Sequence, residues 1–114
     1  MTANEFRKIA LSLPGVVESA HMEHPDFRVG GRIFASLGYP DADWGMVTLA
    51  VEEQGRLVGT APEVFVAAKG SWGRAGSTQV KLKLARREVL GAALKAAYDE
   101  RVRKNARTGP KVKR

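Results

Sequence analysis

The sequence predicts an α+β domain, a two-layer sandwich in which an antiparallel sheet of about 4–5 strands packs against an N-terminal helix and a long C-terminal helix. Three observations lead to this prediction. Apolar residues recur at helical spacing near both ends of the chain. Between them, short segments alternate apolar and polar residues, as half-buried strands do. Tight turns join several of these segments, and strands joined in this way pair antiparallel, because parallel pairing needs a long crossover.

The N-terminal helix has a defined start and end. Thr2 and Glu5 form a capping-box sequence, in which each side chain bonds a backbone N–H of the first turn. Leu13-Pro14-Gly15 ends the helix, because proline cannot continue the helical hydrogen-bond ladder. A single apolar stripe lies between these signals, at Phe6, Ile9, Ala10 and Leu13.

The central segment predicts a β-hairpin followed by a third strand. Gly30-Gly31 separates His24–Val29 from Arg32–Leu37, and a loop of two glycines suits the tight turn of a hairpin. Trp44–Leu49 is the third strand. The three strands together give the sheet its predicted centre.

Two further segments are candidate strands. Glu18–Met22 precedes the hairpin, and Thr78–Leu84 alternates apolar with polar residues. The alternation in Thr78–Leu84 places Lys81 and Lys83 on the same outward face. These two lysines either contact an anionic partner or protect an edge strand from aggregation.

The remaining segments predict helices and one loop. Ala50–Val58 is a short helix, and Pro62–Phe65 is one further helical turn with proline at its first position. Lys69–Gly76 is a glycine-rich loop. The last element is a long helix, Arg86–Arg103, with a broad apolar face.

The positive charge of the chain is unevenly distributed. The 114 residues include 19 Lys and Arg against 12 Asp and Glu, a net charge of +7. Residues 1–100 hold 12 cations and all 12 acids, so the other 7 cations lie within residues 101–114. We expect residues 1–103 to form one domain and residues 104–114 a flexible basic tail. Within the domain, residues 69–87 contain six cations and no acid. A basic arm on a neutral body is typical of a protein with an anionic partner, most often nucleic acid, although a solubilising tail has the same composition.

Composition also excludes several classes of protein. The chain has no cysteine, so it has no disulfide, thiolate metal ligand or cysteine nucleophile. No stretch approaches the roughly 18 uninterrupted apolar residues of a membrane span, and we expect a cytoplasmic protein with no membrane partner. No catalytic triad, phosphate loop or dinucleotide fingerprint is present. We therefore expect no enzymatic activity, no catalytic residues, no cofactor and no metal site.

Two tryptophans and two histidines need separate consideration. Trp72 lies among glycines and either stacks on a nucleic-acid base or folds back over one end of the core, the interpretation we favour. Trp44 is expected in the core. His21 and His24 have the three-residue spacing of helical metal ligands, but they lie in an extended segment, where such positions point to opposite faces. A surface turn or hairpin edge is the expected place for both.

Four short motifs, spread in order over about residues 4–103, have a familiar arrangement: Leu13-Pro14-Gly15-Val16, Phe27-Arg28-Val29-Gly30-Gly31-Arg32-Ile33-Phe34-Ala35, Pro62-Glu63-Val64-Phe65 and Gly70-Ser71-Trp72-Gly73. Their order and spacing resemble the MmcQ/YjbR family. The resemblance implies a compact α+β fold with an antiparallel sheet, likened to double-wing DNA-binding domains, in a bacterial DNA-binding protein. It supplies no catalytic residues. One departure is Ser77-Thr78-Gln79, where many relatives have an aromatic residue near the start of the last strand.

Charge and resemblance together predict a non-enzymatic DNA-binding protein whose contacts are mostly with phosphates and therefore largely independent of base sequence. The alternative is a protein-interaction module that binds a peptide or partner protein on its sheet face. The residues expected to contact DNA come from the last strand, the loop before it and the C-terminal arm: Lys69, Trp72, Arg74, Lys81, Lys83, Arg86, Arg87, Arg101, Arg103, Lys104 and Arg107.

Overall fold

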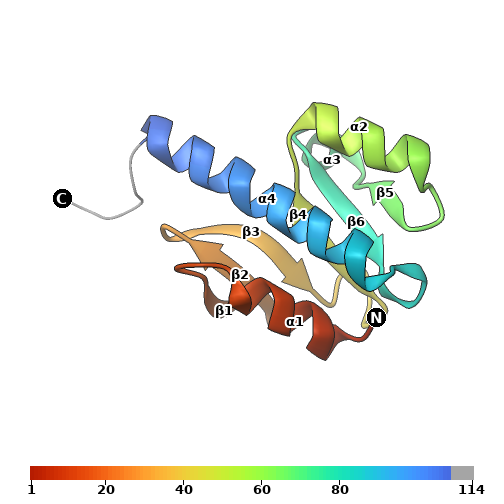
Figure 1. The fold of residues 1–114 in the computed structure, drawn as a ribbon, viewed down its shortest axis with the longest axis horizontal. Coiled ribbons are helices and arrows are strands. Elements are labelled where there is room, and N and C mark those ends of the chain that lie inside the picture. The colour runs from red at the N-terminus through yellow and green to blue at the C-terminus, as the bar shows by residue number, and fades with distance from the viewer. Residues whose placement is uncertain (109–114) are drawn as a thin grey trace.

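The computed structural model describes residues 1–108, in which helices pack on one antiparallel sheet (Figure 1). The helices are α1 (Ala3–Ser12), α2 (Val51–Thr60), α3 (Gly70–Arg74) and α4 (Arg87–Thr108), and a 3-10 turn, η1 (Leu82–Leu84), precedes α4. The strands are β1 (Val17–His21), β2 (His24–Val29), β3 (Arg32–Leu37), β4 (Trp44–Thr48), β5 (Phe65–Ala67) and β6 (Ser77–Lys81).

The sheet has six strands in the order β1-β2-β3-β4-β6-β5, and neighbouring strands are antiparallel throughout. This confirms the predicted α+β architecture, with an N-terminal helix and a long C-terminal helix on an antiparallel sheet (Figure 1). Glycines at the β2–β3 turn have φ of +62° at Gly30 and +79° at Gly31, the left-handed values that a two-residue hairpin requires. Within residues 1–108, no helix combines the length and apolarity needed to cross a membrane.

Helix α1 forms as its sequence predicts. The N–H of Glu5 donates to Oγ1 of Thr2 at 3.1 Å, and the N–H of Thr2 donates to the Glu5 carboxylate at 2.8 Å. The ring of Phe6 lies 5.9 Å from that of Phe27, centre to centre. At Gly45 a Cβ atom would come within 2.7 Å of the Phe6 ring, so glycine at this position leaves room for the aromatic core.

Helices α1, α2 and α4 pack on one face of the sheet (Figure 1). Register partners Ala35 and Val47 point to this face and are fully or almost fully buried. Gln54 ties α2 to the same layer, because its Nε2 donates to the carbonyl oxygens of Gly73 at 2.9 Å and Ser77 at 3.1 Å. The buried face of α4 consists of Leu90, Ala93, Leu94 and Ala97.

The opposite face of the sheet is more open. Ser36 of β3, Met46 of β4 and Gln79 of β6 are register partners in one row, and each is only half-buried. The row continues to Val66 on β5, which is exposed. We call this side of the sheet the open face.

Trp44 lies on the open face, so the prediction that it belongs to the core is wrong. Side chains alternate along β4, and Gly45 takes the core side next to Phe6. Trp44 therefore turns outward and is half-buried, with the ammonium of Lys81 at 5.4 Å from its ring centre.

The turn at Pro62 does not become a helix. The predicted helical turn Pro62–Phe65 is a turn that leads directly into β5. The N–H of Lys81 donates to the carbonyl of Val64 at 2.8 Å, and Phe65 pairs with Val80. Pairing with β6, which is distant in sequence, thus determines the structure of this segment.

The predicted loop Lys69–Gly76 contains the short helix α3. Two glycines of this segment lie close to backbone carbonyl groups of neighbouring segments. A Cβ at Gly73 would lie 1.8 Å from the carbonyl oxygen of Ala68, and one at Gly76 would lie 2.0 Å from that of Leu49.

The predicted strand Thr78–Leu84 ends early, at Lys81. Lys81 pairs with Trp44, the first residue of β4, and the N–H of Leu82 makes one further bond, to the carbonyl oxygen of Asp43 at 3.0 Å. The chain turns into η1, and Leu84, expected inside, is 50% exposed. Lys83 therefore leaves the strand, and the prediction that Lys81 and Lys83 share one strand face is wrong.

The C-terminal helix is longer than predicted. It continues past Arg103 to Thr108, so residues 104–108, assigned to the flexible tail, are helical. Lys111, Lys113 and Arg114 lie outside the described residues.

Candidate functional site

The last turns of α4 are fastened to the tip of the β2–β3 hairpin (Figure 1). The Nδ2 of Asn105 donates to the carbonyl oxygen of Val29 at 3.0 Å. Gly30 makes this approach possible, because a Cβ there would lie 2.5 Å from that Nδ2. The Nη1 of Arg32 donates to Oδ1 of Asn105 at 3.2 Å and to Oγ1 of Thr108 at 2.8 Å.

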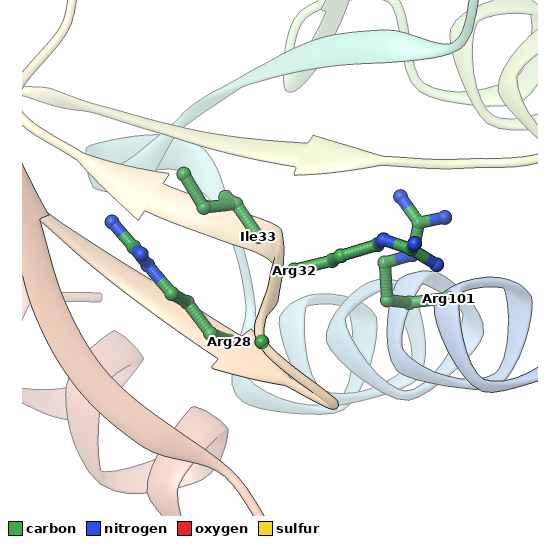
Figure 2. A pocket seen from close by; sticks show the side chains of 5 residues that line it. Arg28, Arg32, Ile33 and Arg101 are labelled. Carbon is green, nitrogen blue, oxygen red and sulfur yellow. The ribbon is translucent and has the colours of Figure 1, made fainter. Parts of the chain in front are cut away.

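This junction forms an open pocket of about 350 Å³. Among residues 1–108, its lining contains three arginines and no acid: Arg28, Gly31, Arg32, Ile33 and Arg101. Figure 2 shows the side chain of Arg32 extending toward that of Arg101, whereas Arg28 points away from both. The guanidinium groups of Arg32 and Arg101 are thus the two charges that face each other across the site.

Arg101 has an unusual environment. Its side chain is partly buried, and its Nε is buried without a hydrogen-bond partner. Burial, and then the charge of Arg32, lower the pKa of the Arg101 guanidinium from its usual value. An arginine remains charged in spite of such effects. The protein therefore holds two positive charges, those of Arg32 and Arg101, close together at a site that is only partly exposed to water.

Arg28 is oriented by a buried carboxylate. Asp26 is fully buried on the open face, and it accepts hydrogen bonds from Nε of Arg28 at 2.8 Å and from Nη2 of Arg28 at 3.1 Å. Nδ1 of His21 donates to the same carboxylate at 2.8 Å. The hydrogen bond from Arg28, assisted by His21, holds the pKa of Asp26 below its usual value.

Further cations continue the site along α4. Arg103 pairs with Glu100 at 2.8 Å, and Lys104 lies 3.8 Å from the same carboxylate. Arg107 is exposed one turn further on. We call the whole group the basic end of the molecule: Arg28, Arg32, Arg101, Arg103, Lys104 and Arg107.

The other expected DNA contacts lie elsewhere. Lys69 and Arg74 flank and end α3, at the start of β6, whereas Lys81 and Lys83 lie at and beyond its other end. Arg86 and Arg87 follow, at the start of α4, and Arg87 is 3.6 Å from the carboxylate of Glu5. The 22 residues of α4 span about 33 Å, so Arg86 and Arg87 lie at the opposite end of this helix from the basic end.

Trp72 differs from its predicted position, whereas the two histidines lie where they were expected but share one face. Trp72 is 74% exposed on α3, so the favoured interpretation, a lid over the core, is wrong. His21 and His24 do form a hairpin edge, but they are cross-strand partners with ring centres 6.3 Å apart. They therefore share one face, because Met22 and Glu23 make a tight turn with positive φ between them. Residues 1–108 contain no group of three or more His, Cys, Asp or Glu that could hold a metal.

Sequence reasoning missed Arg28 and Arg32 as site residues. Both flank Gly30-Gly31, the turn on which the hairpin prediction rests. The sequence did contain a signal for these two site residues. It is a glycine turn, which lets the backbone approach another element closely, with an arginine on each side. Arg101 was predicted as a contact, but its partner Arg32 lies far away in sequence.

A scan against protein-family models matches residues 11–100 to the family described as YjbR. This chain belongs to the YjbR family. The solved structures include a YjbR-like fold in the Deinococcus radiodurans protein DR2400, which carries the family-model domain DUF419. Its crystal structure matches this chain with a TM-score of 0.71 and 19% sequence identity, covering 85% of this chain and 75% of that one. At this identity the likeness shows the fold alone. A search of curated proteins finds no match.

Proposed function

We propose that this YjbR-family protein binds nucleic acid without catalysing a reaction, and that its basic end contacts the phosphates. The observation that supports the proposal is the pocket between the β2–β3 hairpin and α4, whose described lining contains three arginines and no acid, with Arg103, Lys104 and Arg107 following on the same helix. Guanidinium groups match phosphate oxygens in charge and in hydrogen-bond geometry. The sequence continues beyond residue 108 with Lys111, Lys113 and Arg114 and no acid, which adds positive charge.

The cations at the start of α4 provide a second, weaker set of contacts. Lys83 and Arg86 are exposed there, whereas Lys69 and Arg74, also exposed, lie at α3, at the other end of β6. Arg87 and Arg107 are about 30 Å apart along the helix, roughly nine base pairs of duplex. A duplex that lies along α4 therefore reaches both ends of the molecule. Contacts of this kind fix position and do not read bases.

A salt titration against duplex DNA tests the proposal. If about six phosphates are neutralised, log K falls with log salt at a slope near −5. The double variant Arg103→Gln/Arg107→Gln removes two charges from the basic end, and we expect the slope to become shallower by about 2.

A matched double variant provides the comparison. Lys83→Gln/Arg86→Gln has the same net charge but changes the opposite end of α4. We expect its slope to change less than that of the basic-end variant. The proposal is wrong if the wild-type protein shows no salt-dependent binding, or if the two double variants are indistinguishable.

The open face favours a second candidate function, the binding of a peptide or partner protein. Trp44 and Met46 are half-exposed there, and Val66 is exposed at the neighbouring edge strand. Such side chains are typical of protein interfaces. The test is a pull-down after nuclease treatment, with Met46→Glu as the matched variant. We expect one stoichiometric partner with the wild-type protein and its loss with the variant; no stoichiometric partner would rule this candidate out.

A further inference from the structure

We infer that the pocket between the β2–β3 hairpin and α4 is a binding site for one phosphate group, held by the guanidinium groups of Arg32 and Arg101. The inference goes beyond the proposed function, because a small phosphorylated molecule would occupy the site as well as a nucleic-acid phosphate. The volume of about 350 Å³ is within the range of small-ligand sites and larger than a phosphate needs. The remaining space can accept part of the molecule that carries the phosphate.

Arg101 is the first reason for this inference. Other arginines of the described chain have acceptors, such as Arg28 with Asp26 and Arg103 with Glu100. The guanidinium groups of Arg74, Arg86 and Arg107 have no acceptor within residues 1–108, but these side chains are exposed, so water accepts their hydrogen bonds. Among the arginines of residues 1–108, Arg101 alone is partly buried and has no hydrogen bond or ion pair. A partly buried charge without a counter-charge is costly unless a ligand supplies one.

The position of Arg32 is the second reason. Its Nη1 donates to Asn105 and Thr108 on α4, which holds the side chain against the helix that carries Arg101 (Figure 2). Burial lowers the pKa of Arg101, and the nearby charge of Arg32 lowers it further. A dianion between the two guanidinium groups replaces their repulsion by two attractions. The protein thus fixes in advance the geometry that the ligand needs.

The lining favours phosphate among anions. A phosphate carries up to two negative charges and offers several acceptor oxygens, so it can accept from two guanidinium groups at once. Gly31 has no side chain, so its backbone lines the pocket directly, and Ile33 adds an apolar surface to the lining. Arg28 also lines the pocket, but its guanidinium group is paired with Asp26 and points away from Arg32 and Arg101 (Figure 2).

Isothermal titration with inorganic phosphate tests the site directly. We expect the full chain to bind phosphate saturably, with one site per chain. Loss of a charge-assisted donor in Arg101→Gln should weaken binding by at least about tenfold. Arg101→Lys keeps the charge but not the planar fork, so it should weaken binding less than Arg101→Gln while still falling below the wild type. This variant also serves as the test if circular dichroism shows that Arg101→Gln does not fold.

Arg56→Gln is the matched control, because Arg56 is an exposed arginine on α2 paired with Glu53, away from the pocket. We expect it to bind phosphate as the wild type does. The inference is overturned if the wild-type protein does not bind phosphate saturably. Equal weakening by Arg101→Gln and Arg56→Gln would also overturn it, since that result indicates a general effect of net charge.

Competition identifies the source of the phosphate group. If an oligonucleotide displaces bound phosphate, the natural ligand is a nucleic-acid phosphate; if both bind together, it is a small phosphorylated molecule. Phosphate binding without any oligonucleotide binding supports this inference and contradicts the proposed function. Oligonucleotide binding without phosphate binding supports the proposed function and contradicts this inference.

Discussion

At the scale of single residues, Asp26 has the most demanding environment. It lies on the open face of the sheet, yet its side chain is fully buried beneath Arg28 and His21. A buried carboxylate needs such donors, because its charge would otherwise be left without solvation. The two donors hold Asp26 ionised, and Asp26 in turn orients Arg28, which lines the pocket.

The substitution Asp26→Asn should lower the free energy of unfolding by about 1.5–3 kcal/mol at pH 7, because a hydrogen bond to a charged group is lost. The pKa of Asp26 is lowered in the folded protein, so its contribution is present above the unfolded pKa and is lost as the pH falls through the folded pKa. We therefore expect the difference between wild type and variant in urea unfolding experiments to begin to shrink below about pH 4 and to vanish only below the folded pKa of Asp26.

Asp99→Asn is the control for this measurement. Asp99 pairs with Lys95 on the exposed side of α4, and both side chains are more than half exposed. A surface pair of this kind contributes at most about 0.5 kcal/mol. Equal destabilisation by Asp26→Asn and Asp99→Asn would contradict the role given to Asp26.

At the scale of elements, the contact between the β2–β3 hairpin and α4 creates the site. Asn105 joins them from both sides, as donor to Val29 and as acceptor from Arg32. It carries no charge, so it is a positioning residue and not a ligand. The pocket depends on how firmly these two elements are held together.

Asn105→Ala should reduce stability by about 1 kcal/mol through the lost hydrogen bonds. We also expect several-fold weaker phosphate binding, although no charge has been removed. Titration calorimetry measures the second effect and chemical unfolding the first. Unchanged phosphate affinity in a destabilised Asn105→Ala would show that the hairpin contact does not position Arg32.

Substitution of alanine for glycine should change stability in opposite directions at two positions. Gly76→Ala should destabilise by at least about 2 kcal/mol, because φ is +111° and a Cβ would lie 2.0 Å from the carbonyl oxygen of Leu49. Gly55→Ala, on the exposed side of α2 with nothing within 4 Å of the new atom, should stabilise by about 0.5–1 kcal/mol. Thermal unfolding of both variants measures the two signs, and a stabilising Gly76→Ala would contradict the geometry.

Elements with local signals were predicted correctly from sequence. The capping box of α1 and the Gly30-Gly31 turn lie within the segments that they organise. Strand β5 and the end of β6 were not predicted, because both depend on partners elsewhere in the sheet. Phe65 extends because it pairs with Val80, and β6 stops at Lys81 because β4 begins opposite it.

The candidate site was only half predictable for the same reason. The charge pattern identified Arg101, Arg103, Lys104 and Arg107 as a basic group. Nothing in the pattern indicated that Arg32 lies beside Arg101. That proximity follows from the antiparallel hairpin, the length of α4 and the space left by Gly30, which are properties of the assembled fold.

At the scale of the whole molecule, positive charge is concentrated toward one end of α4. The described chain supplies Arg101, Arg103, Lys104 and Arg107 there, and the sequence adds Lys111, Lys113 and Arg114. If all of these act together on nucleic acid, their contributions to the salt dependence should add, because each neutralised phosphate releases counterions separately.

Removal of residues 109–114 tests this additivity. The truncated chain lacks three cations, so the slope of log K against log salt should become shallower by about 3. Binding of inorganic phosphate should not change, since all the residues of 1–108 that line the pocket remain. An unchanged slope would show that these three cations do not contact nucleic acid.

The attachment of the β2–β3 hairpin to α4 through Asn105 has a consequence for how ligands can be found. An occupant of the pocket bridges two parts of the chain that separate on unfolding, so it binds the native state only. Such a ligand raises stability by about 2.7 kcal/mol when its concentration is one hundred times its Kd. The melting temperature of the protein therefore reports occupancy, and a library of phosphorylated metabolites can be ranked by the heat resistance that each confers.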